Sequence, residues 1–387
     1  MTDYVRYYDA DASGANDGTS EANAWQDMNV AASGSNALTA SMVAGDTFVL
    51  NFKRSATAAA QTVAKSFTNS HPIGSTVLFR GYETTPGDAE GVRANRFVYG
   101  ERLQFNNTND GYFLGRDINV EGATNPSSAG ALSVLDGNLV DCDGINAYQG
   151  PGIKVADGVL WRCVGECTSG TPPTSMLRAG IEGTRAQIRD CIGIAGIAFD
   201  CSFRGNSVAG CLAIPKRVGV DIASRHGIYV TTGDSGVGWS ITNCTIYGFA
   251  GSGIGIQDAG VHDDAGELVS GNLIWDCDRY AIECEDDNAT GRGSAAIIVG
   301  NAFGGCTLGN LGGETPLLVS PNTELSADPF EDAAGNNFAV NEAAGGGAAV
   351  RAAALGDFFS LGTDAQRIAG YWQRAGGGGS TPKASIY

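Results

Sequence analysis

A short phrase recurs along the middle of the chain and constrains the fold more than any other feature. Between residues 130 and 305, a few alternating apolar residues are followed by Cys or Asn and then by small residues. A second phrase, usually Gly-Ile followed by alternating residues, falls between these positions, as at Gly152-Ile153 and Gly227-Ile228. Each repeat therefore holds at least two short strands with a period of two. The first phrase ends, at intervals of 20 to 33 residues, at Cys142, Cys163, Cys191, Cys211, Cys244, Asn272 and Asn301.

Strands this short cannot bury a face alone, so the repeats must stack to share one core. Coils stacked about 4.8 Å apart would line a common interior with like residues. The 57 glycines against 11 prolines suit many tight corners between short strands. The sequence thus predicts an all-β fold, a single right-handed parallel β-helix in which the seven Cys and Asn positions lie above one another. The longest interval, Cys211 to Cys244, predicts a loop insertion within residues 214–225 or 231–237.

The ten cysteines fit this ladder better than they fit a disulfide scaffold. Stacked cysteines on parallel strands point the same way, which is poor geometry for a disulfide. We expect most of them to be buried free thiols, with Asn side chains bonding the backbone at the same turn. Disulfides of a secreted protein are the alternative. Metal binding is disfavoured, because Cys163 and Cys167 are the only close pair and have no second pair or His nearby.

The charge balance excludes several kinds of partner. With 42 acidic and 24 basic residues, the chain carries a formal charge of −18. Such a surface repels nucleic acid and anionic membranes, so we expect neither nucleic-acid nor membrane binding. It also repels polyanionic polysaccharides unless a local basic groove exists. The first residues, Met1-Thr2-Asp3, do not begin a basic segment followed by an apolar stretch. We therefore expect no signal peptide and folding in a cytoplasm.

The two ends carry phrases of a known architecture. Asp17-Gly18-Thr19-Ser20 and Trp25 precede Gly45-Asp46-Thr47, and Asp328-Pro329-Phe330 stands near the other end. These phrases resemble the opening and closing segments of right-handed parallel β-helix proteins of the pectate-lyase-like superfamily. They are closest in character to its phage and environmental bacterial structural members. The resemblance covers nearly the whole chain, but it implies an architecture and not an activity, since the superfamily includes pectate lyases, glycoside hydrolases and phage tailspikes.

The repeats and the resemblance together divide the chain into four parts. Residues 1–45 are predicted to form an N-terminal cap, residues 46–318 the β-helix, and residues 319–375 a closing segment that folds back over the last coil. Residues 376–387 begin with four glycines, which predict a flexible linker before a terminal arm. This arm would either dock on a neighbouring subunit or fray.

The densest acidic cluster is the first candidate for chemistry. Paired carboxylates on an exposed face of a β-helix hydrolyse glycosides when they are held about 5 to 9.5 Å apart. They could instead bind Ca²⁺, as in a lyase, with Arg or Lys as the base. The paired-aspartate and arginine pattern of β-helix lyases is not recognisable here, and a solvated loop face is the simpler interpretation. The candidate residues are Asp276, Glu283, Glu285, Asp286, Asp287 and Arg292.

Three other patterns have both a functional and a structural interpretation. Asp9, Asp11 and Asp17 are spaced like the start of a Ca²⁺ loop, although a capping turn with Asx hydrogen bonds explains them more simply. The segment 233–236 (Gly-Asp-Ser-Gly) resembles the phrase around a trypsin-type nucleophile, but none of the three histidines lies in a matching context. Trp161 and Trp239 begin corresponding strands, which favours a stacked aromatic rung over a sugar-binding platform.

These features favour a structural role over catalysis. We expect a non-enzymatic phage virion protein, a capsid decoration, spike or fibre, with adhesion to surface polysaccharide as an added role. Its partners would be other virion proteins or further copies of itself, as in a homotrimer that protects the ends of the β-helix. No cofactor other than Ca²⁺ is expected. The alternatives are a tailspike-type depolymerase, either a glycoside hydrolase or a lyase, and a glycan-binding module without turnover.

Overall fold

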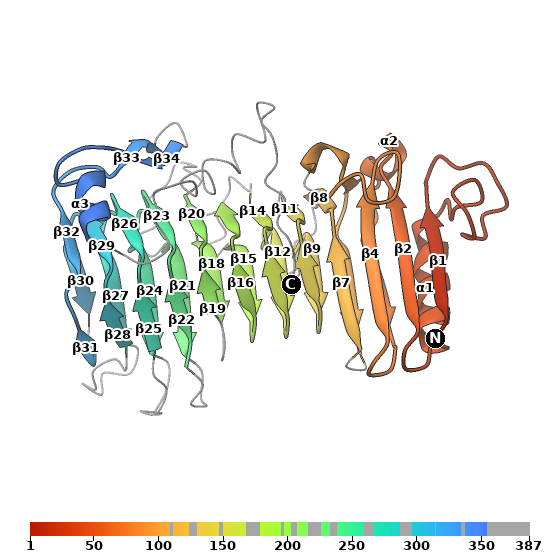
Figure 1. Ribbon diagram of the computed structural model, residues 1–387, viewed down its shortest axis with the longest axis horizontal. Coiled ribbons are helices and arrows are strands. Elements are labelled where there is room, and N and C mark those ends of the chain that lie inside the picture. Colours follow the sequence, from red (N-terminus) through yellow and green to blue (C-terminus); the bar gives the residue numbers. More distant parts are fainter. Residues whose placement is uncertain are drawn as a thin grey trace.

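The computed structural model describes residues 1–90, 92–108, 111–123, 130–146, 150–167, 179–194, 197–202, 207–215, 226–232, 238–258, 267–286, 296–313, 315–333 and 337–353. Over these ranges the chain winds into one parallel β-helix, whose stacked coils form three long parallel sheets, A, B and C (Figure 1). Each coil passes through the sheets in the order A, C, B. Connections between parallel strands of one sheet are right-handed, and the fold is the predicted right-handed parallel β-helix.

The strands are short, and each pairs with its counterpart one coil away. Sheet A runs β1 (Asp3–Tyr8), β2 (Thr47–Lys53), β4 (Thr76–Tyr82), β7 (Tyr112–Arg116), β10 (Asn138–Val140), β13 (Val159–Trp161), β16 (Gln187–Arg189), β19 (Ser207–Ala209), β22 (Ser240–Thr242), β25 (Glu267–Ser270), β28 (Ala296–Val299) and β31 (Leu318–Val319). Sheet B runs β3 (Lys65–Asn69), β6 (Leu103–Asn107), β9 (Leu132–Leu135), β12 (Ile153–Ala156), β15 (Ala179–Thr184), β18 (Ile197–Ser202), β21 (Ile228–Thr232), β24 (Ile254–Asp258), β27 (Tyr280–Asp286) and β30 (Gly309–Gly313). Sheet C runs β5 (Phe97–Tyr99), β8 (Ile118–Ala123), β11 (Asp143–Asn146), β14 (Val164–Cys167), β17 (Ile192–Ile194), β20 (Leu212–Ile214), β23 (Thr245–Tyr247), β26 (Leu273–Trp275), β29 (Ala302–Gly304) and β32 (Thr323–Leu325).

The predicted ladder of Cys and Asn is confirmed. Each of the seven carbonyls accepts a hydrogen bond from the first residue of the sheet C strand one coil later, as Cys142 does from Val164 N–H at 2.9 Å. All seven residues are buried, and the nine cysteines whose side chains are described are free thiols. Asn322 extends the ladder by one coil, because its Oδ1 accepts from Asn301 N–H at 2.8 Å. Asn301 Oδ1 in turn accepts from Asn272 N–H at 3.0 Å.

The turn from sheet A to sheet C uses one residue in the left-handed region. This conformation favours Gly, Asn and Asp, which explains all but one of the residues found there. The exception is Arg162, whose Nε donates to Asp141 one coil earlier at 2.9 Å and whose guanidinium lies 3.9 Å over the Trp161 ring. The turn residues, with φ between 52° and 66°, are Asp117, Asp141, Arg162, Asp190, Gly210, Asn243, Gly271 and Gly300.

The interior changes character along the helix axis. The first coils are filled with phenylalanine, and the Phe79 ring contacts five other Phe rings with centroids 5.1 to 6.0 Å away. The later coils are filled with Ile, Val, Leu and Cys. The register places Trp161 opposite Arg189, Ala209 and Thr242 on successive coils. The predicted rung of stacked Trp161 and Trp239 is therefore wrong, because Trp239 lies in the inner core and the Trp161 Nε1 donates to Asp190 outside it.

Both ends of the solenoid carry additional elements (Figure 1). At the red end, α1 (Met28–Ala40) begins at Asp27, whose carboxylate accepts from Asn29 N–H, and it packs beside β3. Two short helices, α2 (Ala56–Ala59) and the 3₁₀ helix at Arg93–Asn95, lie in the early coils. At the blue end lie the antiparallel pair β33 (Phe330–Asp332) and β34 (Asn337–Val340) and the helix α3 (Gly347–Ala352). The predicted insertions and the arm at 376–387 lie largely outside the described residues, and the division of the chain at 45, 318 and 375 stays a prediction.

Candidate functional site

The best-defined polar cluster lies on the outward face of sheet B, over β21, β24 and β27. Alternation along these strands sends one set of side chains inward, and Ile228, Ile254 and Ile282 align there as core residues. The next positions, Tyr229, Gly255 and Glu283, align on the outward face. On this face Gly255 therefore lies between Tyr229, one coil earlier, and Glu283, one coil later.

His226 lies over this glycine. A Cβ on Gly255 would be 2.7 Å from Cγ of His226, so a larger residue would displace the imidazole. The ring also stacks on Tyr229, with centroids 5.2 Å apart and planes at 10°. His226 is thereby almost fully buried between the sheet and its neighbours. The glycine is thus required by the close approach of a ring, and not by an unusual backbone conformation.

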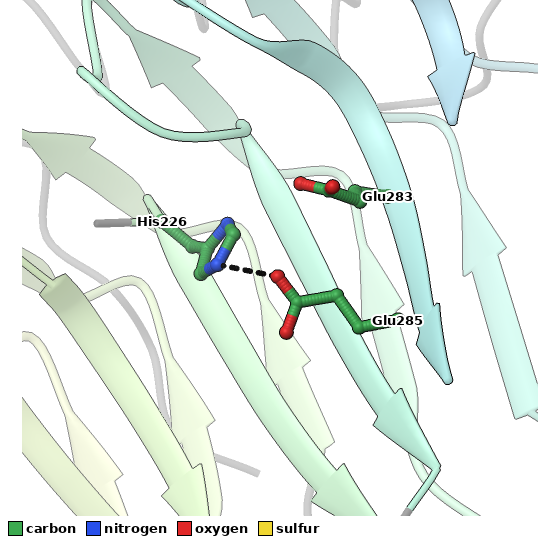
Figure 2. Close-up of side chains that lie close together, drawn as sticks. All are labelled: His226, Glu283 and Glu285. Carbon is green, nitrogen blue, oxygen red and sulfur yellow. Dashed lines mark ion pairs between the residues drawn. The ribbon is translucent and has the colours of Figure 1, made fainter. Parts of the chain in front are cut away.

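The hydrogen bonds of His226 determine which nitrogen carries the proton. The backbone N–H of Ser252 donates to Nδ1 at 3.3 Å, so Nδ1 is the acceptor. The Nε2–H then points to Glu285 Oε1, 3.2 Å away (Figure 2). This hydrogen bond holds the pKa of the Glu285 carboxyl below its usual value. Glu285 remains 26% exposed and is the part of the cluster that solvent reaches.

Glu283 is the buried member of the cluster. Its Oε2 accepts from the Ser252 hydroxyl at 2.5 Å, and its Oε1 forms an ion pair with Arg279. The Ser252 hydroxyl oxygen also accepts from Tyr280 N–H at 3.3 Å. Both carboxylate oxygens of Glu283 are therefore bonded. Its negative charge is balanced by the guanidinium of Arg279, the residue just before β27.

The cluster has the composition of a metal site, but its hydrogen bonding fits an internal network better. Single ligand atoms of His226, Glu283 and Glu285 lie within 4.8 Å of one another. A metal at Nε2 needs the lone pair of that nitrogen, so the ring proton would move to Nδ1. There it would face the N–H of Ser252, which is also a donor. Arg279 would in addition compete with a cation for Glu283.

The sequence-predicted site residues are only partly brought together. Glu283 and Glu285 stand on the outward face of β27, two residues apart. Asp276 lies instead in the left-handed turn after β26, with a φ of 61°. Asp286 ends β27, but its side chain lies outside the described residues, as do Asp287, Arg292 and the segment 233–236.

Three members of the cluster, His226, Ser252 and Tyr229, were missed by sequence reasoning. Each comes from an earlier coil than Glu283. The available signal was the spacing Gly251-x-Gly253-x-Gly255, which lies inside the repeat and indicates close approach to the backbone.

The candidate Ca²⁺ ligands are bonded to other groups. Asp9 forms an ion pair with Lys53 at 3.1 Å and accepts from Asp11 N–H at 2.9 Å. Asp11 accepts from the Thr57 hydroxyl at 2.5 Å. Asp17 accepts from the backbone and hydroxyl of Thr19, at 2.9 and 2.6 Å. The backbone hydrogen bonds of Asp9 and Asp17 are those of Asx turns. At Asp9 the ammonium group of Lys53 already lies where a cation would bind.

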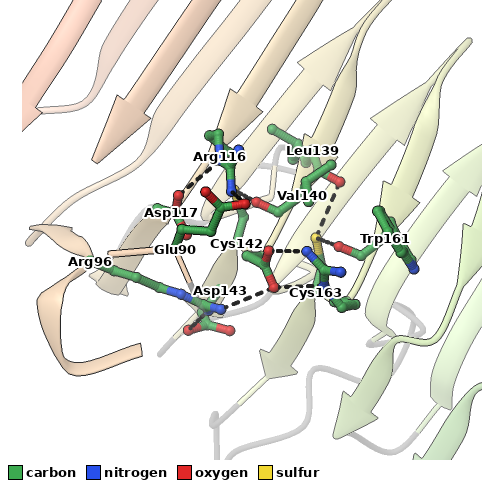
Figure 3. Close-up of polar contacts among 12 residues, drawn as sticks. Glu90, Arg96, Arg116, Asp117, Leu139, Val140, Cys142, Asp143, Trp161 and Cys163 are labelled. Carbon is green, nitrogen blue, oxygen red and sulfur yellow. Dashed lines mark hydrogen bonds and ion pairs between the residues drawn. The ribbon is translucent and has the colours of Figure 1, made fainter. Parts of the chain in front are cut away.

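A second polar cluster surrounds the turns that enter β8, β11 and β14 (Figure 3). Arg96 donates to Asp143 at 2.9 Å and lies 3.5 Å from Asp141. Arg116 donates to Asp117 at 2.9 Å and pairs with Glu90 at 3.2 Å. The aspartates are almost fully buried, and the arginines compensate their charges. The buried aspartates at these turns therefore have arginine partners.

No protein-family model matches the sequence, and no curated protein matches it significantly. Among solved structures, the chain is similar to pectate lyase Pel9A, with 13% identity and a TM-score of 0.38 over 89% of this chain and 90% of that one. It is similar to the alginate lyase AlyGC, with 10% identity and a TM-score of 0.40 over 84% and 41%. It is also similar to the Dettilon tailspike protein, with 14% identity and a TM-score of 0.29 over 82% and 69%.

None of the helices in the described ranges is long and apolar enough to cross a bilayer. The chain is a right-handed parallel β-helix, as the order and pairing of its own three sheets show.

Proposed function

We propose that this protein is a non-enzymatic structural component of a phage particle that binds a neutral polysaccharide along the outward face of sheet B. The observation that carries the proposal is a row of polar side chains in register across that face. Gln104, Ser133, Lys154 and Glu182 follow one another on successive coils. Coils are about 4.8 Å apart, which is comparable to the length of one pyranose unit. A linear glycan lying across the strands would meet the half-buried side chains of Gln104, Lys154 and Glu182. Ser133, between them, is almost fully buried, and its hydroxyl donates to the Gly130 carbonyl.

Rigidity and charge support a neutral glycan as the ligand. A stacked sheet presents these groups in fixed positions, which lowers the entropy lost on binding. The net charge of −18 disfavours uronate polymers. Lys154 and Glu182 pair with one another at 2.5 Å, which leaves this part of the row without net charge.

The pairing within the candidate site supports binding without turnover. Glu283 is bonded to Arg279 and Ser252, and His226 uses one nitrogen for Ser252 and the other for Glu285. An acid and base for hydrolysis would first have to leave these partners. The nine buried or half-buried free thiols support folding in a reducing compartment, as for a protein made in a host cytoplasm.

A depolymerase is the second candidate, and one observation favours it. Oxygens of Glu283 and Glu285 lie within 4.8 Å of one another, slightly closer than the about 5 Å of retaining glycosidases. Glu285 is partly exposed beside a histidine that could donate a proton. This arrangement would act on a sugar lying against β27.

Affinity electrophoresis through gels containing dextran, glucomannan or alginate tests the binding proposal. We expect retardation by at least one neutral polymer and none by alginate. Gln257→Ala, on the outward face of β24, should weaken the retardation, whereas Arg189→Ala, exposed on sheet A, should not. Retardation by alginate alone, or by no polymer, would contradict the proposal.

Product assays separate binding from turnover. Incubation with polymers that bind should release neither reducing ends nor unsaturated uronates. If products appear and Glu285→Gln abolishes them, the protein is a depolymerase and not a binding protein. The virion location is tested by mass spectrometry of purified particles, from which the protein's absence would refute it. A homotrimer predicts three times the chain mass in light scattering.

A further inference from the structure

The outward face of sheet C carries an apolar surface that continues far along the solenoid. Val164, Ile192 and Leu212 pair in register on successive coils, and after Thr245 on β23 the same row continues with Leu273 and Ala302. Ile194, Ile214, Tyr247 and Trp275 form the adjacent row. From β17 to β29 the strands of sheet C are thus apolar on both faces apart from Thr245, which is typical of a parallel sheet buried on both sides. We call these two rows the outer stripe.

The C-terminal elements cover one part of the outer stripe. The rings of Phe330 and Phe338 lie 6.0 and 5.9 Å from the Tyr247 ring on β23. Val350 of α3 is fully buried in the same apolar cluster, and Ala353, just after α3, packs against it. In the described part of the chain, this cover is documented as far as β23.

Beyond β23 the outer stripe remains as buried as the interior. Val164, Ile192, Leu212 and Ile214 are only 2 to 8% exposed. The outer stripe ends at β14. The next residue in the row after Val164 is the charged Asp143 on β11, which pairs with Arg96. On β14 itself, the residue of the adjacent row is Glu166. Something apolar must therefore lie over β20, β17 and β14.

We propose that residues 355–372 of the same chain form this cover. The segment begins where Ala353 already contacts the cluster. The helix α3, which precedes the segment, contacts β32, and from β32 to β14 is six strand spacings, about 29 Å. Eighteen residues in an extended conformation reach up to about 59 Å. Attachment to α3 gives the segment a high effective concentration, which favours it over a second copy. Its large apolar residues are Leu355, Phe358, Phe359, Leu361, Ile368, Tyr371 and Trp372.

Photo-crosslinking of the full-length protein tests the position of this segment. Benzoylphenylalanine replaces Ile194, which is half-buried in the outer stripe, and in a matched control it replaces Thr184, half-buried on sheet B. We expect the Ile194 probe to crosslink residues 355–374 within one chain, at monomer mass, and the Thr184 probe not to do so. A crosslinked dimer would assign the cover to a second copy, and a crosslink only to other segments would refute the proposal.

Hydrogen exchange provides a second test, in which the substituted residues lie outside the strands of the solenoid. The double variant Phe358→Ser, Phe359→Ser should increase exchange in β17 and β20 at least tenfold and raise the fluorescence of a bound apolar dye. Exchange in β16 and β19 of sheet A should change less. Ile386→Ser, beyond the glycine linker, should leave all four strands unchanged. Unchanged exchange in β17 and β20 of the double variant would overturn the proposal.

Discussion

The described thiols have two kinds of surroundings. Burial raises the pKa of the ladder thiols Cys142, Cys163, Cys191 and Cys211 well above its usual value. Cys306 is only half-buried, and a hydrogen bond from Cys277 lowers its pKa. Since the thiolate is the reactive form, the two classes should differ in reactivity.

We predict that iodoacetamide modifies Cys306 first in the native protein. The ladder thiols should react only after denaturation, because they are both buried and protonated. Peptide mapping by mass spectrometry measures each site, and the denatured protein serves as the control in which all sites react alike. Equal labelling of Cys191 and Cys306 in the native protein would show that the ladder opens readily.

Asp117 combines a left-handed backbone with a buried carboxyl. Burial raises its pKa to about 6, although Arg116 opposes this. Among the described residues, its Oδ1 has no hydrogen-bond partner. The folded state therefore binds a proton more tightly here than the unfolded state, whose Asp pKa is about 3.9. The stabilisation from this group is complete below pH 4 and is lost as the pH rises through 6.

We predict that Asp117→Asn is more favourable to stability at pH 8 than at pH 4.5. Two pKa units correspond to at most about 3 kcal/mol, and Asn tolerates the left-handed region as well as Asp does. Urea unfolding of both proteins across this pH range measures the difference. Asp190→Asn, at an exposed left-handed turn, is the matched control. A difference that is constant with pH would show that Asp117 stays ionised.

At the scale of the elements, sequence periodicity revealed the strands but not their full register. The ladder could be predicted because each of its residues follows an alternating strand. Asn322 was missed because the preceding strand, Leu318–Val319, is too short to show alternation. Glu283 and Glu285 could be placed on one face because they are two residues apart. His226 and Ser252 could not be placed beside them, since the variable loops hide how coils align.

We predict that Gly255→Ala destabilises the protein by displacing His226. The new Cβ would overlap the imidazole at 2.7 Å, and overpacking of this kind costs about 1 to 3 kcal/mol. In a His226→Ala background the same substitution should cost much less, so a double-mutant cycle isolates the contact. Chemical denaturation of the four proteins gives the coupling energy. A coupling near zero would mean that Gly255 has another role.

At the scale of the whole molecule, each coil contacts mainly its two neighbours. Stability in such a solenoid is a sum of coil and interface contributions, so a local defect need not unfold the whole chain. The aromatic interior of the first coils and the aliphatic interior of the later ones should therefore respond separately to substitution.

We predict that Phe79→Ala weakens the first coils and leaves the later ones nearly unchanged. Phe79 contacts five aromatic rings, and truncating a buried Phe costs about 3 to 5 kcal/mol. Hydrogen exchange should increase strongly in β2, β4 and β7 and little in β22, β25 and β28. Ile241→Ala, in the core of β22, should give the reverse pattern. If either variant raises exchange equally at both ends, the β-helix unfolds as one unit. Its coils would then be coupled more strongly than nearest-neighbour stacking provides.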